Sequence, residues 1–182
     1  MRTLVFTLTF ALFASAAVAA DRDPDIRNLS AVANAGAVSV RFNLSNAFAD
    51  HDLVHELQSG LPTGFSYIIE IFHDRPRWLD EGISRARIEV VASFNSVTRE
   101  YLLNYRRDRK LVRSESFNDL ESLERRMTAI EEPNLFPIGE RRPYKLKVRV
   151  KADFGRRFLF YLLPASNSTR WREVRVASDG KP

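Results

Sequence analysis

The segment whose residue types most resemble a catalytic pattern is HDLVH, at residues 51–55. Two histidines four residues apart lie on one face of a helix, and a carboxylate beside the first is the arrangement of zinc metalloproteases. Here the carboxylate is Asp52, one methylene shorter than the glutamate that usually acts as general base. His73 is the remaining histidine, and no further ligand follows at the usual spacing. His51 and His55 are therefore candidate metal ligands, with an exposed helical turn as the alternative.

Other catalytic patterns find little support in the sequence. The glycines are isolated, so they form no phosphate-binding loop, and no serine lies in a G-x-S-x-G pattern. Cysteine is absent, which excludes thiolate catalysis, disulfides and cysteine-ligated zinc. A pair of carboxylates that converge in the fold, as in glycosidases, remains open. We expect no catalytic residue and no cofactor.

A row of cations indicates a candidate binding face. Residues 144–151 alternate between apolar and basic side chains, so in a strand the basic ones share one face. Like charges side by side repel one another unless a partner neutralises them. That partner is either an acidic or anionic molecule docked on the face, or acidic residues on neighbouring strands such as Glu70 or Glu89. The candidate binding residues are Arg142, Lys145, Lys147, Arg149 and Lys151.

Four aromatic residues could form either a pocket or part of the core. Trp78 and Trp171 are large and amphipathic, and such residues more often close the end of a sheet core than contact a ligand. Tyr101 and Tyr105 share one face of a strand pattern, which favours core or cross-strand packing. We expect all four side chains in the core.

Length and composition indicate one globular domain. The chain has 182 residues, 45% of them hydrophobic and 28% charged, with a net charge of +5. An apolar run at residues 4–14, then Ala17 and Ala19 before a polar stretch, predicts a signal peptide over residues 1–19 and a single mature domain over 20–182. An uncleaved membrane anchor is the alternative.

Export decides which partners are available to the basic residues. A periplasmic or secreted protein that does not span the membrane after signal removal meets anionic lipids, glycans and envelope proteins rather than nucleic acid.

Strand-type alternation dominates the mature region. Seven or eight strands are expected, at residues 26–33, 37–44, 65–72, 85–94, 100–106, 144–150, 158–163 and 171–176. Apolar residues at helical spacing from Leu120 to Ile130 predict one helix, with Asn118 as N-cap, Glu121 as its capping-box partner and Pro133 as its stop. The pattern favours an antiparallel, Ig-like β-sandwich with one inserted helix, and a closed barrel is the alternative. Residues 158–163 are either a core strand or an exposed apolar patch.

Several short patterns occur in an order that resembles a known family. They are GLP at residues 60–62, RWLD at 77–80, FNSVTREY at 94–101, SF at 116–117, Tyr144, and TRW at 169–171. This series resembles the proteobacterial domain-of-unknown-function family 4390 over residues 26–176. The chain departs from that family beside Trp78, where a second aromatic is common, at Phe94, where tyrosine is common, and in a Pro-rich segment reduced to Pro164. The resemblance implies an envelope protein with a signal peptide, and it brings no activity with it.

Three functional hypotheses follow. The first is a non-catalytic envelope adaptor that docks an acidic or anionic partner through its basic face. The second is a carrier of an apolar or anionic envelope molecule, which requires an enclosed cavity. The third is a metal-dependent hydrolase that uses His51 and His55, which requires further convergent ligands.

Overall fold

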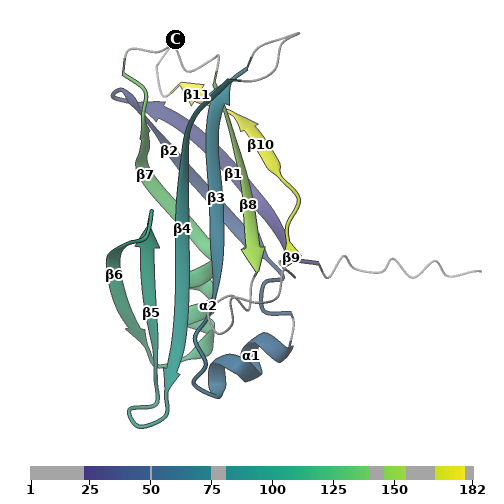
Figure 1. Ribbon diagram of the computed structural model, residues 1–182, viewed down its shortest axis with the longest axis vertical. Coiled ribbons are helices and arrows are strands. Elements are labelled where there is room, and N and C mark those ends of the chain that lie inside the picture. The colour runs from purple at the N-terminus through teal and green to yellow at the C-terminus, as the bar shows by residue number, and fades with distance from the viewer. Residues whose placement is uncertain (1–22, 50, 75–80, 140–145, 155–166, 179–182) are drawn as a thin grey trace, which may run out of the picture.

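Two β-sheets and two short helices form the part of the chain that the computed structural model describes, residues 23–49, 51–74, 81–139, 146–154 and 167–178 (Figure 1). In chain order these elements are β1 (Asp25–Asn34), β2 (Ala37–Ser45), α1 (His51–Gln58), β3 (Thr63–His73), β4 (Glu81–Asn95), β5 (Glu100–Arg107), β6 (Lys110–Phe117), α2 (Leu120–Thr128), β7 (Ala129–Pro137), β8 (Leu146–Phe154), β9 (Asn167–Ser168), β10 (Arg172–Arg175) and β11 (Ala177–Ser178).

The strands form a small and a large sheet. The small sheet has the order β11-β1-β2-β7, and the large sheet has the order β10-β8-β3-β4-β5-β6, with β9 also pairing with β8. Every pairing is antiparallel except the short one between β1 and β11. Neither sheet closes on itself within the described residues. The predicted antiparallel β-sandwich is confirmed, and the closed-barrel alternative is not what these strands form.

The alternating strands place their apolar faces between the sheets. In β8, Leu146, Val148, Val150 and Ala152 are all buried, while the residues between them lie on the other face. β3 lies in the middle of the large sheet, paired with β4 on one side and β8 on the other. It is a nearly continuous apolar run, as expected for a strand covered on both faces.

Aromatic rings fill the centre of the space between the sheets. The rings of Phe42, on the small sheet, and Tyr67, on the large sheet, meet edge to face with centroids 5.2 Å apart. Phe65 packs beside Tyr67 and is fully buried. The Tyr67 hydroxyl donates a hydrogen bond of 2.8 Å to the backbone carbonyl of Met127 in α2. Burial raises the pKa of Tyr67 well above its ordinary value, so this hydroxyl stays a donor.

The helix α2 forms where its period predicted it but has different ends. Its N-cap is Asp119, not the expected Asn118: the Asp119 backbone is extended and its carboxylate accepts a 2.7 Å hydrogen bond from the Ser122 N–H. The helix ends at Thr128, and Pro133 lies within β7 rather than stopping the helix. Leu123 and Met127 provide the buried face of α2.

The described residues contain eleven strands and two helices, more than the seven or eight strands and one helix expected. The additional helix is α1, which begins with residues 51–55. The sequence pattern did not predict the strands β6 and β7. The expected strand at residues 158–163 and residues 144–145 lie outside the described part of the chain.

Candidate functional site

The outer face of the large sheet, which points away from the small sheet, carries rows of charged side chains. Glu70 of β3 lies between Arg85 of β4 and Arg149 of β8 in the strand register. Arg149 Nε donates to Glu70 Oε2 at 2.7 Å, and Arg85 Nε lies 3.6 Å from Glu70 Oε1. The Glu70 carboxylate therefore lies between two cations and neutralises part of their charge, as the sequence indicated it could.

The other two described cations of the predicted row are also paired. Lys147 Nζ lies 2.8 Å from Asp74, and Lys151 Nζ lies 3.0 Å from Asp153. The hydrogen bond from Lys147 and the positive charge of Lys147 and Arg175 hold the pKa of Asp74 below its ordinary value. Acidic residues within the molecule thus balance Lys147, Arg149 and Lys151. The remaining members of the row, Arg142 and Lys145, lie outside the described residues.

Trp171 lies on the surface of this face, so the expectation that it closes the core is wrong. Its side chain is 37% exposed, with the guanidinium of Arg149 4.6 Å and the ammonium of Lys151 5.5 Å from the ring. The reason is its position directly before the edge strand β10, which begins at Arg172. The Arg172 side chain points toward the small sheet and binds the Asp25 carboxylate in a bidentate pair, at 2.9 and 2.7 Å. The side chain of Trp171, one residue earlier, lies on the opposite face. Trp171 contributes cation–π contacts to the outer face instead.

The two tyrosines are buried, as expected, and Trp78 lies outside the described residues. Tyr101 is 8% exposed and its ring packs on Phe94, with centroids 4.9 Å apart. Tyr105 is 1% exposed. Neither tyrosine contributes to the surface of the candidate face.

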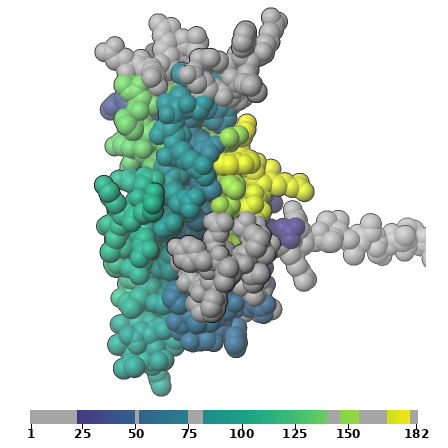
Figure 2. Space-filling model, viewed as in Figure 1, coloured from purple at the N-terminus to yellow at the C-terminus, as the bar shows by residue number. Residues whose placement is uncertain are grey.

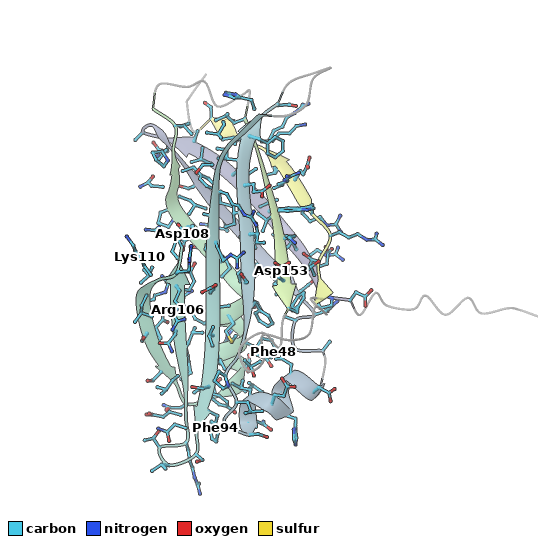
Figure 3. All side chains as sticks on the ribbon, in the orientation of Figure 1. Phe48, Phe94, Arg106, Asp108, Lys110 and Asp153 are labelled. Carbon is cyan, nitrogen blue, oxygen red and sulfur yellow. The ribbon has the colours of Figure 1, made fainter. Side chains whose placement is uncertain are left out.

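A second group of cations surrounds the turn between β5 and β6, and we call it the basic corner: Arg87, Arg106, Arg109 and Lys110. Figure 3 labels Arg106, Asp108 and Lys110 close to one another at this turn. Asp108 and Arg109 both have positive φ, 50° and 69°, a conformation that glycine or asparagine adopts more readily. The Asp108 carboxylate accepts a 2.9 Å hydrogen bond from the Arg87 N–H, which fastens the turn to β4.

The cations of β8 are neutralised by acidic residues, whereas those of the basic corner have no such partners among the described residues. Within the described ranges, none of its four side chains forms an ion pair. The nearest carboxylates in the register are Glu89, opposite Arg106, and Asp108, which is engaged with backbone. Leu111 and Val112 follow directly on β6 and are 59% and 51% exposed. The corner therefore combines unpaired positive charge with exposed apolar side chains.

Comparison with known proteins identifies the family. The family model "Domain of unknown function (DUF4390)" matches residues 21–160. The chain belongs to the DUF4390 family. No curated protein and no solved structure matches it. The DUF4390 match includes β1 to β8, hence the whole basic corner and the cations of β8, but not Trp171.

The histidine pair of this DUF4390 chain lies on α1, four residues apart as expected. Across the residues that the structure describes, no group of three or more histidine, cysteine, aspartate or glutamate side chains could hold a metal ion. The metal-site hypothesis for His51 and His55 thus lacks a third ligand in that part of the molecule.

A buried polar network connects the two sheets, and the sequence did not predict it. The Tyr105 hydroxyl on β5 donates a hydrogen bond to the carboxylate of Glu132 on β7, and Arg107 Nη1 donates to the same carboxylate at 3.2 Å. The guanidinium of Arg113 lies over the Tyr105 ring at 3.9 Å. Burial and the negative charge of Glu132 raise the pKa of Tyr105, so its hydroxyl stays protonated. The network therefore links β5 of the large sheet to β7 of the small sheet.

Proposed function

We propose that this DUF4390 protein is a non-catalytic interaction module of the bacterial envelope, which docks on an anionic lipid surface through the outer face of its large sheet. The basic corner makes the primary contact. The observation that carries this proposal is the difference between the two groups of cations: those of β8 are ion-paired within the molecule, and those of the corner form no ion pair in the part of the chain that the structure describes.

The energetics favour the corner as the contact. A lysine or arginine close to an anionic membrane contributes about 1 kcal/mol, provided that it need not abandon a partner. Lys147 and Arg149 would have to leave Asp74 and Glu70 to make such a contact. The exposed Leu111 and Val112 suit the boundary between head groups and acyl chains, where apolar side chains flanked by cations bind.

The carrier hypothesis finds less support. A carrier needs an apolar cavity, and the centre of the space between the sheets is filled by the rings of Phe42, Phe65 and Tyr67.

Neither described helix is long and apolar enough to cross a membrane. The apolar run and small residues of positions 1–19 support the periplasm as the proposed location.

Vesicle flotation tests the proposal directly. The mature chain, residues 20–182, is mixed with vesicles of phosphatidylcholine alone or of phosphatidylcholine with phosphatidylglycerol. We expect capture by the anionic vesicles only, and its loss between about 0.1 M and 1 M salt, as the Debye length falls from about 10 Å to about 3 Å.

Two outcomes would contradict this expectation. Equal capture by both kinds of vesicle would mean that apolar contact, not charge, drives binding. Binding to neither would remove the lipid surface as the partner and leave an acidic protein as the candidate.

A further inference from the structure

Two consecutive apolar residues, Leu111 and Val112, project from the first half of β6, and we call them the apolar pair. They are 59% and 51% exposed. Consecutive residues of a regular strand point to opposite faces, so one of the two would ordinarily face inward. The register between β5 and β6 shifts between Tyr105 and Arg106, which makes Val112 an extra residue, and such a bulge redirects side chains. Both members of the pair therefore lie at the surface.

The cations of the basic corner surround the apolar pair. Arg106 lies directly opposite Leu111 in the strand register, and Arg109 and Lys110 immediately precede Leu111 in the sequence. Over the ranges that the structure describes, these three cations form no ion pair. Figures 1 and 2 show β6 at the outer side of the molecule, with no described element beyond it. A molecule that covers the apolar pair therefore meets unpaired positive charge beside it.

The turn that carries these residues is fastened to both layers of the fold. The Asp108 N–H donates a 2.8 Å hydrogen bond to the Arg87 carbonyl, and the Asp108 carboxylate accepts one of 2.9 Å from the Arg87 N–H. Toward the small sheet, Arg107 donates to Glu132 of β7 at 3.2 Å. Because the turn is already ordered, little affinity is lost to ordering it when a partner binds.

We propose that the apolar pair inserts between the lipids of an anionic membrane, so that the partner of the basic corner is a fluid, loosely packed bilayer. This inference rests on the docking function proposed above and specifies its partner more closely. A bilayer offers anionic head groups beside an apolar layer, and the corner presents cations beside an apolar pair. A protein interface takes about 20 to 30 residues a side, far more than the corner and the pair provide.

Insertion makes capture depend on how tightly the lipids pack. Binding by charge alone would not distinguish two bilayers with the same head groups, whereas inserted side chains must displace lipid and are sensitive to the acyl chains. The test compares fluid vesicles of dioleoyl phosphatidylcholine and dioleoyl phosphatidylglycerol with gel-phase vesicles of the dipalmitoyl lipids. We expect at least about 10-fold weaker capture by the gel-phase vesicles, from the loss of burial of two half-exposed apolar side chains.

A single introduced cysteine locates the insertion, because the chain has no cysteine of its own. Leu111→Cys, labelled with a fluorophore that brightens in apolar surroundings, should gain emission on the fluid anionic vesicles. Leu102→Cys is the matched control. Leu102 is also an exposed apolar residue, on the neighbouring strand β5, but its partners in the register are Ser93 and Ser116 rather than cations. Its label should not change.

The double variant Leu111→Thr, Val112→Thr removes the apolar pair and keeps every charge. It should lose about 10-fold in capture by the fluid vesicles, while Leu102→Thr binds as the unmodified protein does. Equal capture by gel-phase and fluid vesicles, or an unchanged label at residue 111 on vesicles that capture the protein, would overturn the insertion and leave docking by charge intact. No capture by either kind of anionic vesicle would remove the docking proposal itself, and the insertion with it.

Discussion

Gly64→Ala is expected to lower the free energy of unfolding by about 3 kcal/mol, the upper range for an added methyl group with no room. A Cβ at Gly64 would lie 2.0 Å from the Val90 carbonyl oxygen and 2.8 Å from the Val91 Cα. Both atoms belong to the backbone of β4, which pairs with β3 in the middle of the large sheet. A backbone cannot turn aside as a side chain can, so the two strands must separate locally.

Gly82→Ala is the control for this prediction. Gly82 lies in β4, and a Cβ there would meet nothing within 4 Å. Its replacement should be neutral or stabilise the protein by up to about 1 kcal/mol, because alanine loses less chain entropy on folding. Urea unfolding measures both variants. Similar stabilities for the two would mean that β3 and β4 do not approach each other as described.

Glu132→Ala is expected to cost about 2 to 3 kcal/mol of stability. Glu132 is 6% exposed, and its carboxylate accepts hydrogen bonds from Tyr105 and Arg107. Its loss leaves the buried Tyr105 hydroxyl without an acceptor and frees Arg107 from its partner, and an unsatisfied buried donor costs about 1 to 3 kcal/mol. Because β5 and β7 belong to different sheets, the variant also weakens the contact between the layers.

The neighbouring residue provides the comparison. Glu131 lies on the same strand and pairs with Arg41, but both side chains are about two-thirds exposed. Glu131→Ala should therefore change the stability by less than about 0.5 kcal/mol, as exposed ion pairs contribute little. Thermal unfolding of the two variants side by side distinguishes them. A loss for Glu131→Ala as large as that for Glu132→Ala would remove the network as the cause.

The alternation of apolar and polar residues predicted the strands that have one face in the core, and it did not predict β6 and β7. The hairpin of β1 and β2 and the strand β8 show regular apolar spacing, because the core takes every second residue. β6 is an edge strand that is exposed or half-buried along its length, so it lacks the apolar alternation of a strand with one face in the core. β7 contains Pro133, which indicated a helix stop but is also tolerated in an edge strand.

The candidate face was predictable only in part, because charge balance is set by the register between strands. The row of cations on β8 was visible in the sequence, and Glu70 was foreseen as a partner. Asp74 and Asp153 were not, since they lie beyond or at the end of the alternating segment. In the basic corner, pairing of β4 with β5 brings Arg87 beside the turn. The remaining signal, the run RRDRK at residues 106–110, could have been interpreted as a charged hairpin turn.

Capture by anionic vesicles of a corner variant is the most direct test of the docking proposal. Reversal of three exposed charges, in Arg106→Glu, Arg109→Glu and Lys110→Glu, should weaken capture at least about 100-fold, at about 1 kcal/mol for each cation. The matched variant, Arg106→Lys, Arg109→Lys and Lys110→Arg, keeps every charge and should bind as the unmodified protein does. Undiminished capture of the charge-reversed variant, with its thermal unfolding unchanged, would contradict the assignment of this face.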